Sequence, residues 1–127
     1  MIHSYFRRVR DKLKEISPLI KSENVTLDVV SADMGILKGR IVLLDGSILD
    51  FREIVSAAEH DYRFHWMDEA NKLIIRWDTA PHHRQLSNFP FHKHTGKEVY
   101  NSEELDFIGA LEYIKKDLII RLHNKFV

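Results

Sequence analysis

The middle of the chain is a series of short apolar segments separated by turn-forming residues, and this pattern constrains the fold most. The dipeptide Asp45-Gly46 stands between two such segments. Asp-Gly between apolar runs predicts a β-hairpin with a type I′ turn, because glycine adopts positive φ readily. Residues 68–71 are expected to connect a second pair of strands. The expected strands comprise residues 25–33, 36–44, 47–55, 60–67 and 72–78.

Both ends of the chain show apolar residues at helical spacing. Residues 1–16 predict an amphipathic helix with a basic flank, which ends at Ser17-Pro18. A C-terminal helix is expected to begin at Ser102, whose hydroxyl can cap its N-terminus. The sequence therefore predicts an α+β fold, with an antiparallel meander sheet of about five strands flanked by an N-terminal and a C-terminal helix.

Length and composition favour one soluble domain spanning residues 1–127, since no linker or repeat divides the chain. Cysteine is absent, which excludes disulfides, thiolate metal sites and a cysteine nucleophile. The 19 basic and 19 acidic side chains cancel, so no global field attracts nucleic acid or membrane. The sequence shows neither a signal peptide nor an apolar run long enough to span a bilayer, and we expect a cytoplasmic protein.

Histidine is concentrated in one segment. Of the eight histidines, His82, His83, His92 and His94 lie within residues 82–94. Prolines 81 and 90 exclude a continuous helix there, because proline lacks the amide hydrogen and restricts the residue before it. This clustering of acid–base groups in a constrained segment indicates a site.

Three kinds of chemistry fit the site, and the first is RNA cleavage without a metal or another cofactor. Imidazole can act as base or acid near neutral pH, so histidine can deprotonate a 2′-hydroxyl and protonate the leaving 5′-oxygen. Asp78 is expected to orient a histidine ring. Cationic side chains would hold the phosphate. The predicted catalytic residues are His82, His83, His92, His94 and Asp78. The predicted phosphate-binding residues are Arg76, Arg84 and Lys93.

The other two alternatives are metal binding and no catalysis. His92 and His94, two residues apart on an extended segment, would point the same way and could bind a metal together with His82 or Asp78. No established metal-binding spacing is present. In the third alternative, the histidines belong to an exposed polar loop and only form local hydrogen bonds.

The motifs around this segment resemble the TumE-type toxin family. They are residues 62–66 (Tyr-Arg-Phe-His-Trp), 75–83 (Ile-Arg-Trp-Asp-Thr-Ala-Pro-His-His) and 88–94 (Asn-Phe-Pro-Phe-His-Lys-His). The family pattern often has asparagine and histidine where this chain has Thr79 and Phe91.

The resemblance implies the toxin of a prokaryotic toxin–antitoxin pair, with a helix-turn-helix or nucleotidyltransferase-like antitoxin and ribonuclease activity on RNA. A non-enzymatic antitoxin-binding protein is the rival reading, and a homodimeric state is left open.

Overall fold

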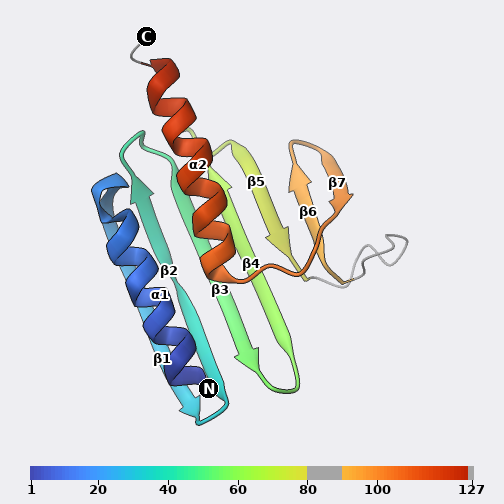
Figure 1. Cartoon of the computed structure of the whole chain (residues 1–127). Helices are drawn as coiled ribbons and strands as arrows, with labels where there is room; N and C mark the ends of the chain where they lie inside the picture. The colour runs from blue at the N-terminus through green and yellow to red at the C-terminus, as the bar shows by residue number, and fades with distance from the viewer. Residues whose placement is uncertain (80–89, 126–127) are drawn as a thin grey trace.

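Strands adjacent in the chain are also adjacent in the sheet, as the computed structural model shows for residues 1–79 and 90–125, the part it describes (Figure 1). The sheet is antiparallel throughout and has the order β1-β2-β3-β4-β5-β6-β7. The strands are β1 (Ile20–Ser31), β2 (Met34–Leu43), β3 (Ile48–Ser56), β4 (His60–Met67), β5 (Leu73–Asp78), β6 (His92–Thr95) and β7 (Glu98–Asn101). The helical elements are α1 (Ile2–Ile16), η1 (Ser17–Leu19) and α2 (Phe107–Lys125).

The predicted α+β fold, with a helix at each end and a meander sheet, is confirmed. The estimate of about five strands is short by two, since the described residues contain seven. The missed strands, β6 and β7, have only four residues each, with the sequences HKHT and EVYN. They lack the alternation of apolar and polar residues that marks the other strands, so hydrophobic periodicity could not reveal them.

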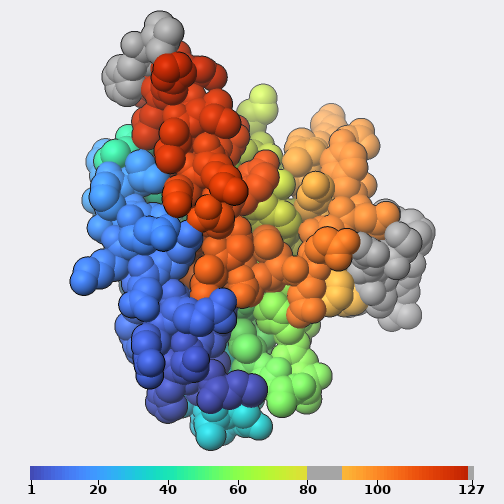
Figure 2. All heavy atoms as spheres, viewed as in Figure 1, coloured from blue at the N-terminus to red at the C-terminus, as the bar shows by residue number. Residues whose placement is uncertain are grey.

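Both helices pack on one face of the sheet, which we call the inner face (Figure 1). The space-filling view shows α1 and α2 covering much of that face, with β6 and β7 beyond them (Figure 2). The Phe107 ring of α2 lies 4.3 Å from that of Phe51 on β3, between ring centroids. Because side chains alternate along a strand, the neighbours of these inner residues point to the opposite, outer face. None of the helices in the described ranges is long and apolar enough to cross a membrane.

The N-terminus of α2 differs from the prediction. The helix begins at Phe107, and the Asp106 carboxylate accepts a hydrogen bond from the Gly109 amide at 2.8 Å. Ser102 instead donates its hydroxyl hydrogen to the Glu103 carbonyl at 2.9 Å. The expected serine cap is therefore wrong, because the aspartate directly before the helix fills that position.

The turn at Asp45-Gly46 forms the predicted hairpin but has a different geometry. The Gly46 amide donates to the Leu43 carbonyl at 2.9 Å, and Gly46 has φ of 86°. Asn71 is the only non-glycine described residue with positive φ, so Asp45 is outside that region. The connection is a type I turn followed by a positive-φ glycine, and the predicted type I′ turn is wrong.

Gly39 on β2 allows β1 to approach closely. A Cβ atom added at this glycine would lie 2.0 Å from the backbone oxygen of Asn24. We expect Gly39→Ala to lower the free energy of unfolding by about 3 kcal/mol or more, because backbone must move to relieve this overlap. Urea denaturation monitored by circular dichroism measures the loss.

Gly96→Ala is the matched control for this variant. Both glycines have positive φ, 156° at Gly39 and 56° at Gly96. At Gly96, however, an added Cβ would meet nothing within 4 Å. Its cost should be about 1–2 kcal/mol, which reflects backbone conformation alone. Equal losses for the two variants would contradict the role of close strand approach at Gly39.

Candidate functional site

The pairing of β5 with β6 assembles the site. Trp77 of β5 faces inward, since its ring meets the Tyr113 ring of α2 edge-on at 5.1 Å between centroids. The residues on either side of Trp77 therefore lie on the outer face, together with their cross-strand partners. The three cross-strand pairs are Arg76 with His94, Trp77 with Lys93 and Asp78 with His92.

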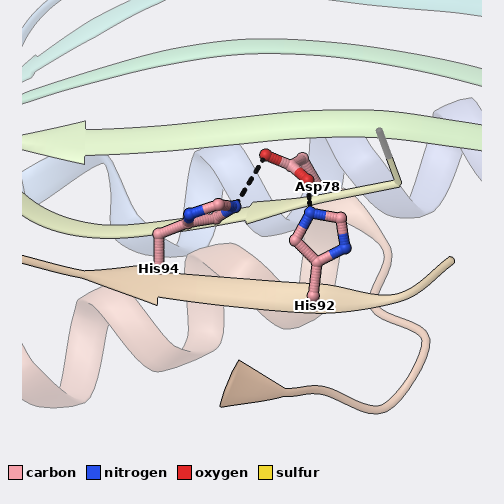
Figure 3. A group of neighbouring side chains, drawn as sticks. All are labelled: Asp78, His92 and His94. Carbon is pink, nitrogen blue, oxygen red and sulfur yellow. Dashed lines mark ion pairs between the residues drawn. The ribbon is translucent and has the colours of Figure 1, made fainter. Parts of the chain in front are cut away.

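The Asp78 carboxylate is the centre of this arrangement (Figure 3). His92 forms an ion pair with its Oδ1 through Nε2, and His94 Nε2 lies 3.3 Å from its Oδ2. Arg76 donates from Nε to the same Oδ2 at 3.0 Å. Asp78, His92 and His94 are buried, with exposed fractions of 5%, 1% and 8%. We call these four residues the Asp78 site.

Two contacts hold the ring of His92. Its Nδ1 lies 2.8 Å from the carbonyl oxygen of Pro90, which can only accept. Its Nε2 faces the Asp78 carboxylate, which also accepts when ionised. The His92 ring is thus held between the Pro90 carbonyl and the Asp78 carboxylate.

The geometry also fits a metal ion. One ligand atom from each of Asp78, His92 and His94 can be chosen so that all lie within 4.8 Å of one another. Two histidines and a carboxylate are a common donor set for zinc. The metal set expected from the sequence, His82, His92 and His94, is met only in part, since His82 lies outside the described residues.

The remaining predicted residues divide into two groups. His83 and Arg84 lie, like His82, outside the described residues. Lys93 is the cross-strand partner of Trp77, so it lies on the inner face. The structure therefore brings Arg76, Asp78, His92 and His94 together and separates Lys93 from them.

A second polar cluster, not predicted from the sequence, lies on the inner face. Glu53 of β3 is fully buried, accepts the Tyr5 hydroxyl at 2.6 Å and lies 2.7 Å from His60 Nε2. The other ring nitrogen of His60 lies 2.6 Å from Glu104. The available signal was a glutamate at an inward position of a strand, two residues after Phe51. This cluster connects α1, the sheet and the segment before α2.

A pocket of about 730 Å³ adjoins the Glu53 cluster. It is lined by Met1, Ser4, Tyr5, Arg8, Glu53, Val55, Ser56, His60, Glu104, Leu105 and Asp106. Burial lowers the pKa of His60, but hydrogen bonds with Glu53 and Glu104 outweigh it, so the pKa is raised overall. Burial and the neighbouring Glu53 also raise the pKa of the Tyr5 hydroxyl.

The fold and the Asp78 site define a small antiparallel α+β protein with a buried Asp/His/Arg cluster at the β5–β6 pairing. A family model described as Toxin TumE matches residues 7–124, and the chain belongs to this toxin family. It is thus the toxin component of a toxin–antitoxin system and has an antitoxin as partner. Neither the search of curated proteins nor the search of solved structures found a match.

The raised pKa of His60 predicts a pH-dependent contribution to stability. Its protonated form is favoured in the folded state, so this contribution is complete below the unfolded pKa of about 6.5 and is lost as pH rises through the folded value. We expect His60→Gln to destabilise the protein more at pH 6 than at pH 9. Urea denaturation at both pH values measures this difference.

His123→Gln, at an exposed position of α2, is the control. Its effect on stability should be small at both pH values. An effect of His60→Gln that stays constant from pH 6 to pH 9 would contradict protonation-linked pairing with the two glutamates.

Proposed function

We propose that this toxin is a ribonuclease that cleaves RNA without a metal ion, using the Asp78 site. The observation that carries the proposal is the shared carboxylate of Asp78, which contacts His92, His94 and Arg76 at once. Acid–base groups, an orienting carboxylate and a phosphate-binding cation lie together, as phosphodiester cleavage requires. The reaction would take place in the cytoplasm, where the RNA substrate is found.

The proposed reaction is an internal transfer of the phosphate. A base removes the proton of the 2′-hydroxyl, and the 2′-oxygen forms a bond to phosphorus. The bond between phosphorus and the 5′-oxygen then breaks, and an acid gives the leaving oxygen a proton. The products are a 2′,3′-cyclic phosphate and a free 5′-hydroxyl.

The residues divide between these tasks by their contacts. Of the two histidines in the Asp78 site, His94 has the more exposed side chain, at 10% against 1% for His92, so we assign acid–base work to His94. His92 holds Asp78 in place. Arg76 is 27% exposed and, in the described ranges, hydrogen-bonds only through Nε, which leaves its terminal nitrogens for phosphate.

The second acid–base group would come from His82 or His83, and Arg84 would add a phosphate contact, as the sequence suggests. Lys93 is left out of the proposed site because it lies on the inner face. The antitoxin would be a helix-turn-helix or nucleotidyltransferase-like protein.

We expect His94→Ala to reduce cleavage of single-stranded RNA at least about 100-fold, since a general acid or base contributes about 10²–10⁴-fold. The measurement is product formation at pH 6 to 8 with chelator present, with detection of the 2′,3′-cyclic phosphate. His123→Ala on α2 is the matched histidine control and should cleave at the wild-type rate. Wild-type protein that leaves RNA uncut with and without divalent metal would refute ribonuclease activity.

Metal binding is the second candidate, and it is favoured by the proximity of the ligand atoms of Asp78, His92 and His94. It predicts stoichiometric zinc or nickel in protein purified without an affinity tag, and loss of that metal in His92→Ala. Cleavage that survives chelation in metal-free protein would exclude a metal requirement. Full growth inhibition by His94→Ala would instead favour a toxin that acts only by binding.

A further inference from the structure

Three cationic side chains form a row across the outer face. Lys38 of β2, Arg52 of β3 and Arg63 of β4 are successive cross-strand partners, and all three are exposed. Their inward-facing neighbours confirm the face, because the ring of Phe64, next to Arg63, contacts that of Phe107 in α2. We call Lys38, Arg52 and Arg63 the cationic ladder.

This arrangement opposes the stability of the sheet. Like charges directly opposite each other on neighbouring strands are destabilising. Among residues 1–79 and 90–125, none of the three cations forms an ion pair that would offset this repulsion. Arg63 contacts His65, at 3.3 Å between Nη2 and Nδ1. The neighbouring Asp50 is already held by Arg40 through hydrogen bonds of 2.8 and 2.9 Å.

Protection of sheet edges does not explain the ladder. Charged residues on edge strands prevent unwanted strand pairing. The ladder instead lies on β2, β3 and β4, which are all interior to the sheet. A row of exposed cations on interior strands, none of them in an ion pair with another described residue, points to an anionic ligand.

The ladder leads directly to the Asp78 site. Arg63 is the cross-strand partner of Asp78, so the row continues from Lys38 through Arg52 and Arg63 to the carboxylate. Three strand spacings separate Lys38 from Asp78, roughly 14 Å across the sheet.

A second outer-face row runs alongside, in which His65 of β4 pairs with Arg76 of β5. Burial, followed by the charges of Arg63 and Arg76, lowers the pKa of His65, which is consistent with a cationic surface at this place.

We propose that the cationic ladder binds the phosphate backbone of single-stranded RNA and directs it to the Asp78 site. This inference rests on the proposed function in taking RNA as the ligand. An extended row of separate cations suits a single strand that lies across the sheet. The row holds no aromatic side chain for base stacking, so binding should be electrostatic and independent of sequence.

The test measures binding separately from cleavage. All proteins carry His94→Ala to prevent turnover, and affinity for a labelled oligouridine is followed by fluorescence anisotropy over a range of salt concentrations. The ladder variant combines Lys38→Gln, Arg52→Gln and Arg63→Gln. Each lost phosphate contact should reduce the slope of log affinity against log salt by about 0.7, so the triple variant should lose about 2.

The control variant combines Arg7→Gln, Arg10→Gln and Lys14→Gln, at exposed positions of α1. It changes the net charge equally, and its affinity and slope should match the parent. The ladder variant should unfold at no lower urea concentration than the parent, because its substitutions remove like-charge repulsion. Weak binding therefore cannot be attributed to unfolding.

Equal affinities and slopes for the ladder and control variants would overturn the proposal. So would a ladder variant that binds RNA normally but no longer binds the antitoxin, because the face would then be a protein interface. RNA binding that depends on the ladder, with no cleavage by the wild type, would support the ladder and refute the ribonuclease. The ladder variant can also be made with His94 intact. If that protein cleaves RNA with an unchanged KM, the ribonuclease is supported and the role of the ladder is refuted.

Discussion

The register between β5 and β6 is the constraint on which the site depends. It places Asp78 opposite His92 and Arg76 opposite His94, so residues distant in sequence share one face. A slip of one residue would turn both histidines to the inner face and bring Lys93 to the outer one, because side chains alternate along a strand. The inward packing of Trp77 against Tyr113 of α2 fixes the face of β5 on which Arg76 and Asp78 lie. The core on one face of the sheet thereby fixes the chemistry on the other.

Charge compensation couples the site to the fold. A buried carboxylate loses the hydration it has in water, and Asp78 regains favourable interactions from Arg76, His92 and His94. On the inner face, the buried Glu53 carboxylate is stabilised in the same way, by contacts with Tyr5 and His60. The two carboxylates stabilise different junctions: Glu53 connects α1 to the sheet, and Asp78 connects β5 to β6. Loss of one partner leaves a buried charge uncompensated, so activity measurements on site variants need stability measurements beside them.

The sequence was informative wherever local chemistry decides the structure. Alternating apolar residues and turn residues located β1 to β5, and the spacing of His92 and His94 correctly predicted that their side chains point the same way. The short polar strand β7 gave no such signal, since its order comes from pairing with β6. Ser102 had the right residue type for a helix cap, but sequence could not show that Asp106 would take that position.

The sequence predicted part of the site: four of the proposed residues lie together, and Lys93 does not. The grouping of Arg76, Asp78, His92 and His94 follows from residue type and alternation. Lys93 was included by its nearness in sequence, although the same alternation sends it to the inner face. Glu53 was missed because its partners Tyr5 and Glu104 are far from it in sequence, and their contact exists only in the folded chain.

The inner face of the sheet is covered by the helices, whereas the outer face of the central strands is exposed and charged. The inner face supplies the apolar packing of both helices, so charged side chains on the outer face of the central strands do not disrupt the core. Arg52 lies between two cations, Lys38 and Arg63, an arrangement that costs stability in the free protein. A bound polyanion would turn this repulsion into attraction, because counterions are released when cations contact phosphates. The register of β4 against β5 aligns these cations with the Asp78 site, so a shift between these two strands would separate the ladder from the Asp78 carboxylate.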